Sequence, residues 1–195
     1  MPNLFEEFRA IVAALGAARV PYAICGGIAM SIHARPRATI DIDLLAPPAA
    51  VASIADALLP CEFVRRERTP TRLAGGEVVM HRLTKIVPGD PEVLLLDVIE
   101  VQPGATERAW QTRIDTEWEG HFVTVVSRAG LIGLKRLRGS PQDIADIALL
   151  EEQEGPAPSG LCWRLPRHET YVCRFTGRLS ARGPSNASAR IRPSC

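Results

Sequence analysis

The sequence predicts an α+β domain in which helices flank a mixed β-sheet. Apolar residues at helical spacing open the chain, short apolar strands fill its middle, and two capped helices follow up to about residue 150. The 195 residues suit one domain with a small appendage. Hydrophobic residues at 46% and charged residues at 23% are typical of a globular protein that stays in solution.

The first third of the chain alternates helices with strands. Apolar residues three or four positions apart indicate helices, and short apolar runs bounded by Gly or Pro indicate strands. In chain order, the expected elements are a helix over 4–15, a strand over 20–25, a helix over 28–34, a strand over 39–45 and a helix over 49–59.

Strands then dominate until two helices end the domain. The strands are expected over 62–66, 77–83, 92–101 and 121–126. Ser127 is a good N-cap for a helix that runs to Arg138, and Ser140-Pro141 starts another helix that runs through Leu150.

Residues 155–195 differ in composition from the rest of the chain. They are rich in Pro, Gly, Ser and Arg and show no periodicity, which predicts a disordered tail after a domain of residues 1–154. The tail holds seven Arg and one Glu, whereas residues 1–154 hold 16 basic and 21 acidic residues. An RNA-binding arm is the alternative for the tail, but few apolar residues could anchor it. The mildly acidic composition of residues 1–154 gives no case for a basic nucleic-acid-binding face on the domain.

A cytoplasmic location and reduced thiols are expected. Charged residues interrupt the apolar residues of 1–18, so no signal peptide is recognised there. No stretch reaches the roughly 18 apolar residues of a membrane span, and no membrane partner is expected. The five cysteines form no C-x-x-C pair and no regular disulfide spacing.

Asp41 and Asp43 are candidate metal ligands. They lie two positions apart on an expected strand, so both side chains point to one face while the intervening Ile42 points to the other. Two carboxylates this close repel each other and suit a shared hard cation such as Mg²⁺. The alternative is an acidic, solvent-facing strand at the edge of the sheet.

Gly26-Gly27 strengthens the metal hypothesis. The pair ends an apolar strand, leads into a helix, and precedes Asp41 by about 15 residues, the length of one intervening helix. Backbone N–H groups at such a helix start favour anions, and glycine lets a phosphate approach closely. The pair is therefore a candidate nucleotide-binding turn.

Asp97 is the third candidate acid. It lies within the apolar run 94–99, where an unpaired carboxylate would be costly to bury. If this strand neighbours that of Asp41, then Asp97 serves as a third ligand or as a general base. The alternative is a buried carboxylate paired with an Arg or with backbone groups. Glu100 lies nearby but on the opposite face of its strand.

The run GGIAMSIHARPRATIDIDL over 26–44 resembles the signature of minimal nucleotidyltransferases in the DNA polymerase beta superfamily. The most similar subgroup contains AbiEii-like toxin proteins, in which G-G-x-A, a His, R-x-T and D-[IV]-D follow in this order. The stretch 131–147 is similar to that subgroup's helical segment with Lys, Arg and D-x-x-D. Together these motifs cover about residues 20–150 and imply the nucleotidyltransferase fold.

The resemblance implies a role for each matching residue. Gly26 and Gly27 would hold the nucleotide phosphates, and Lys135 would contact the triphosphate. Arg37 is a candidate partner for a phosphate or for Asp41. Ile28 stands where many nucleotidyltransferases have Ser or Thr. The residues expected to be catalytic and to bind two Mg²⁺ ions are Asp41, Asp43 and Asp97.

The expected activity is transfer of a nucleoside monophosphate from an NTP, such as ATP, to an acceptor hydroxyl. The acceptor is a tRNA, a protein or a small molecule, and the resemblance favours a role in toxin–antitoxin pairing or phage defence, with a cognate antitoxin as a partner. One alternative is a catalytically silent module of the same fold that binds NTP or a partner. Another is a metal-dependent phosphodiesterase or nuclease, since clustered carboxylates also serve that chemistry.

Overall fold

A computed structural model describes residues 4–35, 38–67, 69–87, 89, 93–118 and 121–152, and two short strands beyond them. Contacts divide the chain into two units, Met1–Ala157 and Pro158–Cys195. In the second unit, β9 (Cys162–Trp163) and β10 (Val172–Cys173) form an antiparallel pair. The boundary expected after residue 154 and the rest of the tail expected to be disordered lie outside the described residues.

The first unit contains the functional candidates. Its helices are α1 (Leu4–Ala17), α2 (Gly26–His33), α3 (Val51–Ala57), α4 (Ala105–Gln111), α5 (Arg128–Arg138) and α6 (Pro141–Glu152). Its strands are β1 (Ala23–Ile24), β2 (Asp41–Ala46), β3 (Val64–Arg65), β4 (Thr71–Leu73), β5 (Val78–Ile86), β6 (Val93–Glu100), β7 (Ile114–Trp118) and β8 (His121–Val125). Short 3-10 turns lie at η1 (Pro48–Ala50), η2 (Leu59–Cys61) and η3 (Ala74–Gly76).

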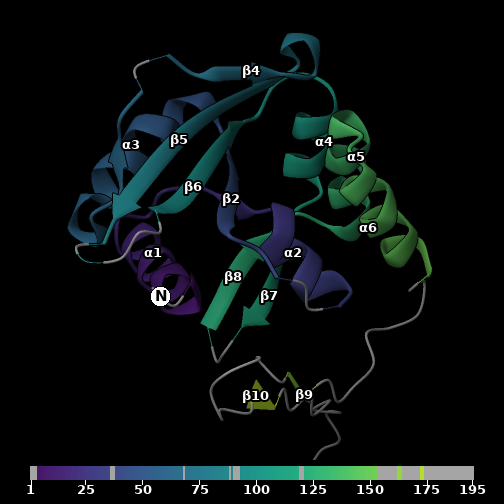
Figure 1. Cartoon of the computed structure of the whole chain (residues 1–195), viewed down its shortest axis with the longest axis horizontal. Coiled ribbons are helices and arrows are strands. Elements are labelled where there is room, and N and C mark those ends of the chain that lie inside the picture. Colours follow the sequence, from purple (N-terminus) through teal and green to yellow (C-terminus); the bar gives the residue numbers. More distant parts are fainter. Residues whose placement is uncertain are drawn as a thin grey trace, which may run out of the picture. The chain divides into compact units, whose positions relative to one another are not determined.

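The strands form one mixed sheet in the order β3-β5-β6-β2-β1-β8-β7, with β4 paired to β5 (Figure 1). The pairs β2–β6 and β1–β8 are parallel, and the remaining pairs are antiparallel. Helices α4, α5 and α6 gather at one side, and α1 and α3 lie near each other on another (Figure 1). This architecture confirms the predicted α+β class with a mixed sheet.

One face of the sheet is apolar and is covered by α1. Phe8 of α1 packs edge-on against Trp118 of β7 with ring centroids 4.9 Å apart, while Glu7 of the same helix binds Lys85 of β5 at 2.9 Å. The helix therefore crosses most of the sheet. Strand residues buried on this face include Ile42, Leu44, Leu83, Leu96 and Val98. Because side chains alternate along a strand, the acidic residues between them must lie on the other face.

Several elements differ from the predicted ones. Strands β4 and β7 and helix α4 were not predicted. Strand β4 is exposed along its whole length and β7 along most of it, so neither is marked by an apolar run. The helix predicted over 49–59 is shorter, since Pro48 and Pro60 lie in 3-10 turns on either side of α3.

The predicted N-cap at Ser127 is present. Its side chain accepts a hydrogen bond from the Gly130 backbone N–H at 3.1 Å, and α5 starts at the next residue. None of the helices in the described part of the chain has the length and apolar character needed to cross a membrane.

Candidate active site

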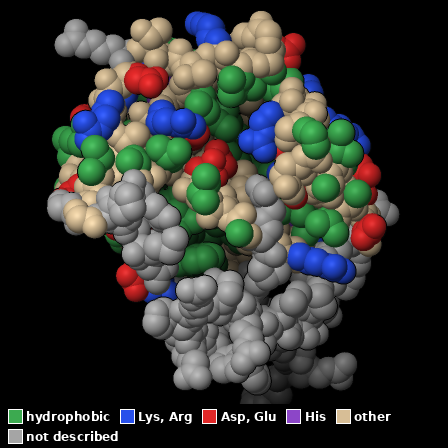
Figure 2. Space-filling model, in the orientation of Figure 1, with side chains coloured by type: hydrophobic (Ala, Val, Ile, Leu, Met, Phe, Trp, Pro, Cys, Tyr) green, Lys and Arg blue, Asp and Glu red, His purple; other side chains and the backbone are tan. Residues whose placement is uncertain are grey.

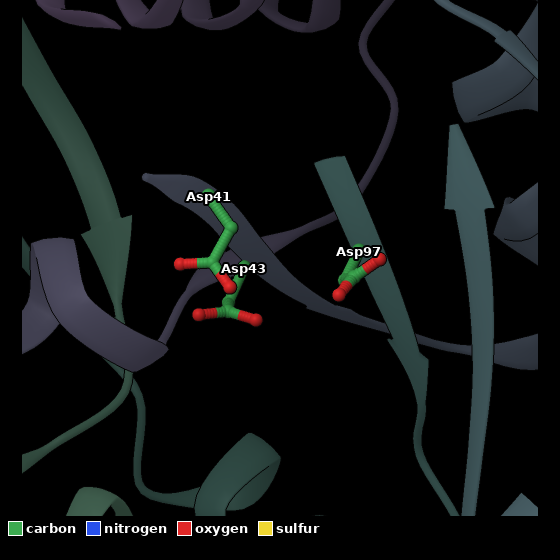
Figure 3. Close-up of side chains that lie close together, drawn as sticks. All are labelled: Asp41, Asp43 and Asp97. Atoms are coloured by element: carbon green, nitrogen blue, oxygen red, sulfur yellow. The ribbon is translucent and has the colours of Figure 1, made fainter. Parts of the chain in front are cut away.

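Asp41, Asp43 and Asp97 converge on the polar face of the sheet (Figure 3). Asp41 and Asp43 lie on β2, and Asp97 lies directly beside Asp43 because β2 and β6 run parallel in that register. One carboxylate oxygen from each residue lies within 4.8 Å of the others. The condition set from the sequence, that the Asp97 strand neighbours the Asp41 strand, is met.

The glycine turn contacts this acidic cluster directly. Gly26 starts α2 with φ +60°, a left-handed conformation that side chains rarely adopt. A Cβ on Gly26 would overlap the Asp43 carboxylate, and one on Gly27 would overlap the Thr39 side chain. Two glycines are needed here because the helix start and the acidic strand touch, whether or not a phosphate also binds.

Hydrogen bonds fix the two carboxylates of β2. The Thr39 hydroxyl donates to Asp41 Oδ1 at 2.8 Å. The backbone N–H of Gly27 donates to the Asp43 carboxylate, and the Cys25 N–H donates to the Asp43 carbonyl at 3.0 Å. One N–H of the helix start, expected to be free for a ligand, is thus bonded to Asp43.

Arg82 of β5 holds Asp97 from the other side. Its Nε donates to Asp97 Oδ1 at 2.8 Å and a terminal nitrogen donates to Oδ2 at 2.7 Å, a bidentate pair. Asp97 is therefore both a member of the acidic cluster and a buried carboxylate paired with an Arg. The two interpretations of Asp97 that the sequence left open are compatible with each other.

Crowding of the three acids alters the ionisation of Asp43. Burial, followed by the charges of Asp41 and Asp97, raises the pKa of Asp43 to about 7, against the smaller opposing effects of Arg138 and the Gly27 N–H. A carboxylate that is hard to ionise beside two others indicates a deficit of positive charge. A divalent cation would supply that charge.

The donor set fits Mg²⁺. Carboxylate oxygens are the hard ligands that Mg²⁺ prefers, and it commonly binds one or two of them together with substrate phosphates. Asp41 and Asp43 are half-buried, while Asp97 is buried. The three side chains lie closely enough to share ions, which is the requirement that the sequence could not test.

Basic residues of α5 lie beside the cluster and are held by α6. Lys135 is only 4% exposed and donates to Asp146 at 2.6 Å, with Asp143 at 3.5 Å. Arg138 forms a bidentate pair with Asp143 at 2.7 Å but keeps 56% of its side chain exposed. Asp41 and Asp43 are close enough to contribute to raising the pKa of Arg138, after the larger effect of Asp143.

The space-filling view agrees with this arrangement. Acidic side chains lie near the middle of the face, in a hollow with Lys or Arg side chains on either side (Figure 2). Arg82 and Arg138 come from elements on opposite sides of β2, namely β5 and α5. An anionic ligand that reached the carboxylates with divalent cations would therefore meet guanidinium groups as well.

The other candidate residues either lie away from the acidic cluster or fall outside the described residues. His33 Nε2 lies 2.6 Å from the Val126 carbonyl, and burial lowers the pKa of His33, as expected for a packing residue. Glu100 contacts His81 at 2.7 Å on the other face of the sheet. Arg37 lies outside the described residues. Cys25 is a buried free thiol whose pKa is raised well above its usual range, mainly by burial.

Arg82 and Thr39 were not singled out from the sequence. Arg82 lies in a predicted strand, but only the register of β5 against β6 brings it opposite Asp97. Thr39 belongs to the R-x-T motif, and its contact with Asp41 across two residues gives that motif a physical purpose. Pairing across strands carries no local sequence signal, whereas a contact at i, i+2 can be anticipated.

Comparisons with known proteins support the fold. No protein-family model matches the chain, and no curated protein matches it. The solution structure of the antibiotic-resistance factor ANT(2'')-Ia has a TM-score of 0.55 at 17% identity, covering 77% of this chain and 83% of that one. TM1012 of Thermotoga maritima, provisionally assigned as a nucleotidyltransferase, has a TM-score of 0.50 at 14% identity, covering 77% and 88%.

A crystal structure of ANT(2'')-Ia in complex with adenylyl-2''-tobramycin gives a TM-score of 0.50 at 18% identity, covering 76% of this chain and 87% of that one. At these identities the likeness defines the fold. The chain has the nucleotidyltransferase fold, and its three acids lie together on one face of that fold's sheet.

Proposed function

We propose that the chain is a Mg²⁺-dependent nucleotidyltransferase that moves a nucleoside monophosphate from an NTP to an acceptor hydroxyl. The observation that carries the proposal is the convergence of three carboxylates from β2 and β6 within 4.8 Å, against a glycine turn. A nuclease or phosphodiesterase also uses clustered carboxylates, but the motif order over 26–44 and the fold favour the transferase.

Asp41, Asp43 and Asp97 would hold two Mg²⁺ ions, with Asp97 open to a second role as general base. When bound, the ions stabilise the attacking and leaving oxygens of an in-line displacement at the α-phosphate. Thr39 keeps the Asp41 carboxylate oriented, and Gly27 does the same for Asp43. Arg82 fixes the Asp97 carboxylate in the metal-free protein. The Thr39 and Gly27 contacts hold two of the ligands in place before the substrate arrives.

Nucleotide phosphates are proposed to lie between the glycine turn and α5. Gly26 and Gly27 hold the start of α2 against the acidic strand and remain the proposed phosphate-binding turn, with Arg37 as a candidate partner. The sequence suggests Lys135 for the triphosphate, but its ammonium group is buried against Asp146. Arg138, one turn further along α5, is half-exposed and preorganised by Asp143, so we assign it the direct phosphate contact and Lys135 a supporting charge.

The AbiEii-like assignment and the toxin–antitoxin role are proposals that rest on the order of motifs in the sequence. The cytoplasmic location is a proposal that rests on the interrupted apolar pattern of residues 1–18. The acceptor is a tRNA, a protein or a small molecule. An antibiotic-like acceptor is consistent with the likeness to ANT(2'')-Ia, whose structure was solved with adenylyl-2''-tobramycin.

The proposal is tested with NTPs labelled at the α-phosphate, incubated with Mg²⁺ and three acceptor pools: total tRNA, the product of the neighbouring gene, and aminoglycosides. Transfer to one pool is expected from the wild type and not from Asp41→Asn or Asp43→Asn. Asp56→Asn, which removes an exposed carboxylate on α3, is the matched control and should stay active.

The alternative of a catalytically silent module has its own signature in this experiment. Ile28 stands where a hydroxyl is common, and it is buried, which gives that alternative its support. Mg-NTP binding that is lost in Asp41→Asn, together with no transfer to any pool and no pyrophosphate release, would favour the silent module. Release of cleaved mononucleotides from RNA would favour the nuclease.

A further inference from the structure

We propose that Arg82 is a built-in cation that competes with divalent metal for Asp97 and thereby sets the metal affinity of the site. The inference deepens the proposed function, because it rests on the same acidic cluster. Arg82 is a positioning residue outside the three carboxylates, and its effect on metal binding can be measured without turnover.

The geometry that carries it is a row of three side chains across adjacent strands. Asp43, Asp97 and Arg82 lie directly opposite one another on β2, β6 and β5. Arg82 donates to both oxygens of Asp97, at 2.8 and 2.7 Å. A divalent ion that binds Asp97 must therefore share an oxygen with the guanidinium group or displace one of its hydrogen bonds.

The guanidinium group of Arg82 and a divalent metal ion compete for the Asp97 carboxylate because both are positively charged. Asp97 is 5% exposed and has Asp43 beside it, so it needs a positive partner when no metal is bound. Arg82 supplies one charge. A metal ion brings two more to within a few ångströms, and the guanidinium then opposes its binding.

Arg82 can move away from Asp97 because its side chain is partly exposed to solvent. Its side chain is 38% exposed, so turning away exchanges contact with Asp97 for contact with water. The pair of Arg138 and Asp143 differs, since Asp143 is fully buried and also accepts hydrogen bonds from the Ser140 N–H and hydroxyl. Both pairs are bidentate, but of the two only the Arg82 pair includes a carboxylate of the acidic cluster, and Asp97 lacks the added hydrogen bonds from Ser140 that hold Asp143.

Two opposite effects of one substitution follow. Removing the Arg82 charge leaves Asp97 without its partner in the metal-free protein, which lowers stability. The same change removes the charge that repels the ion, which raises metal affinity. A residue with a purely structural role would lower both stability and metal affinity, because a disordered Asp97 would bind metal less well.

The test measures Mn²⁺ and Mg²⁺ binding to the full chain by isothermal titration calorimetry at pH 8.5, where the carboxylates are ionised. Arg82→Met is expected to bind the ions about tenfold more tightly than the wild type. Arg82→Lys keeps the charge but cannot form the bidentate pair, so its metal affinity should lie closer to that of the wild type than to that of Arg82→Met. Arg66→Met is the matched control, because Arg66 donates its hydrogen bond to Thr84 and not to a carboxylate of the cluster. The metal affinity of Arg66→Met should equal that of the wild type.

Thermal unfolding with EDTA and with metal provides the second readout. Arg82→Met should melt below the wild type in EDTA and recover more of its stability on metal addition than the wild type gains. If Arg82→Met does not fold in EDTA, Arg82→Gln, which can keep one hydrogen bond to Asp97, takes its place in both measurements.

Unchanged or weaker metal affinity in Arg82→Met overturns the inference, and so does the absence of binding in every variant. Binding by Arg82→Met when the wild type shows none supports it. The NMP-transfer assay is separate: a chain that shows the expected order of metal affinities but transfers no NMP keeps this inference and rejects the proposed function.

Discussion

The backbone N–H of Gly27 donates a hydrogen bond to the carboxylate of Asp43. This contact joins the start of α2 to β2 at the point where Asp97 also approaches. It stabilises the ionised form of Asp43 while burial and two neighbouring acids oppose ionisation. The balance of these effects favours binding of a cation beside Asp43. It also makes the stability of the metal-free protein depend on pH.

The first prediction concerns the stability of the metal-free protein. Because the pKa of Asp43 is raised to about 7, the folded state keeps a proton that the unfolded chain releases above about pH 4. The unfolding free energy should therefore fall, relative to Asp43→Asn, as pH rises from 4 to 7, and the difference should level off above 7. Since Asp43 is half-buried and retains some solvent contact, we expect a change on the order of 2 kcal/mol.

Urea unfolding in EDTA at pH 5 and pH 8 measures this effect, with Asp43→Asn as the reference that cannot ionise. Added Mg²⁺ should remove the loss at pH 8, because it supplies the missing positive charge. An equal difference between wild type and Asp43→Asn at the two pH values would contradict the assignment.

The second prediction concerns the glycine turn. Gly26→Ala places a methyl group against the Asp43 carboxylate and forces a side chain into φ +60°, which alone costs roughly 1–2 kcal/mol. We expect lower thermal stability and a loss of metal binding, since Asp43 must shift. Gly133→Ala is the control, because a Cβ at that position on α5 meets nothing within 4 Å.

Gly133→Ala should raise the unfolding free energy by about 0.5–1 kcal/mol, as alanine does in helix interiors. If Gly26→Ala were equally harmless and still bound metal, the close approach of α2 and β2 would not matter to the site.

Much of this site could be predicted because its signals are local. Alternation along 39–45 places Asp41 and Asp43 on one face, and the break between apolar and glycine residues marks the start of α2. The strand of Asp97 was identified by its apolar content. Its register against β2 was a condition rather than a prediction, because strand pairing is decided by the whole sheet.

The missed features depend on partners distant in sequence. The pairing of Arg82 with Asp97 requires β5 to lie antiparallel to β6, and a different register would have paired another residue. The burial of Lys135 could not be read from a helix that is rich in basic residues, since it depends on α6 folding back against α5. Strand β4 was not predicted because all three of its residues are exposed.

The third prediction concerns the buried pair of Lys135 and Asp146. Lys135→Met should cost about 3 kcal/mol or more in unfolding free energy, because it leaves a buried carboxylate without its cation. The double variant Lys135→Met/Asp146→Leu should regain most of that loss, since neither charge remains to be compensated. Chemical unfolding of the two single variants and the double variant gives the coupling energy. Losses that simply add would show that the pair does not stabilise the contact of α5 with α6.

The last prediction separates Arg138 from its neighbour Arg136 on the same helix. Both pair with carboxylates of α6, Arg138 with Asp143 at 2.7 Å and Arg136 with Glu151 at 2.8 Å, and both are more than half exposed. Arg138 lies close enough to Asp43 to lower the pKa of that carboxyl group, and Asp43 and Asp41 in turn contribute to raising the pKa of Arg138.

Arg138→Gln should therefore weaken Mg-NTP binding by about tenfold, the loss of one charge-assisted contact, while leaving NMP binding less affected. Arg136→Gln should bind NTP as the wild type does. Fluorescent nucleotide titration compares them, and the melting temperature of each variant shows whether Asp143 tolerates the loss of its partner. Equal NTP affinities for the two variants would contradict the assignment of the phosphate contact to Arg138 and would favour Lys135 instead, one turn earlier on α5.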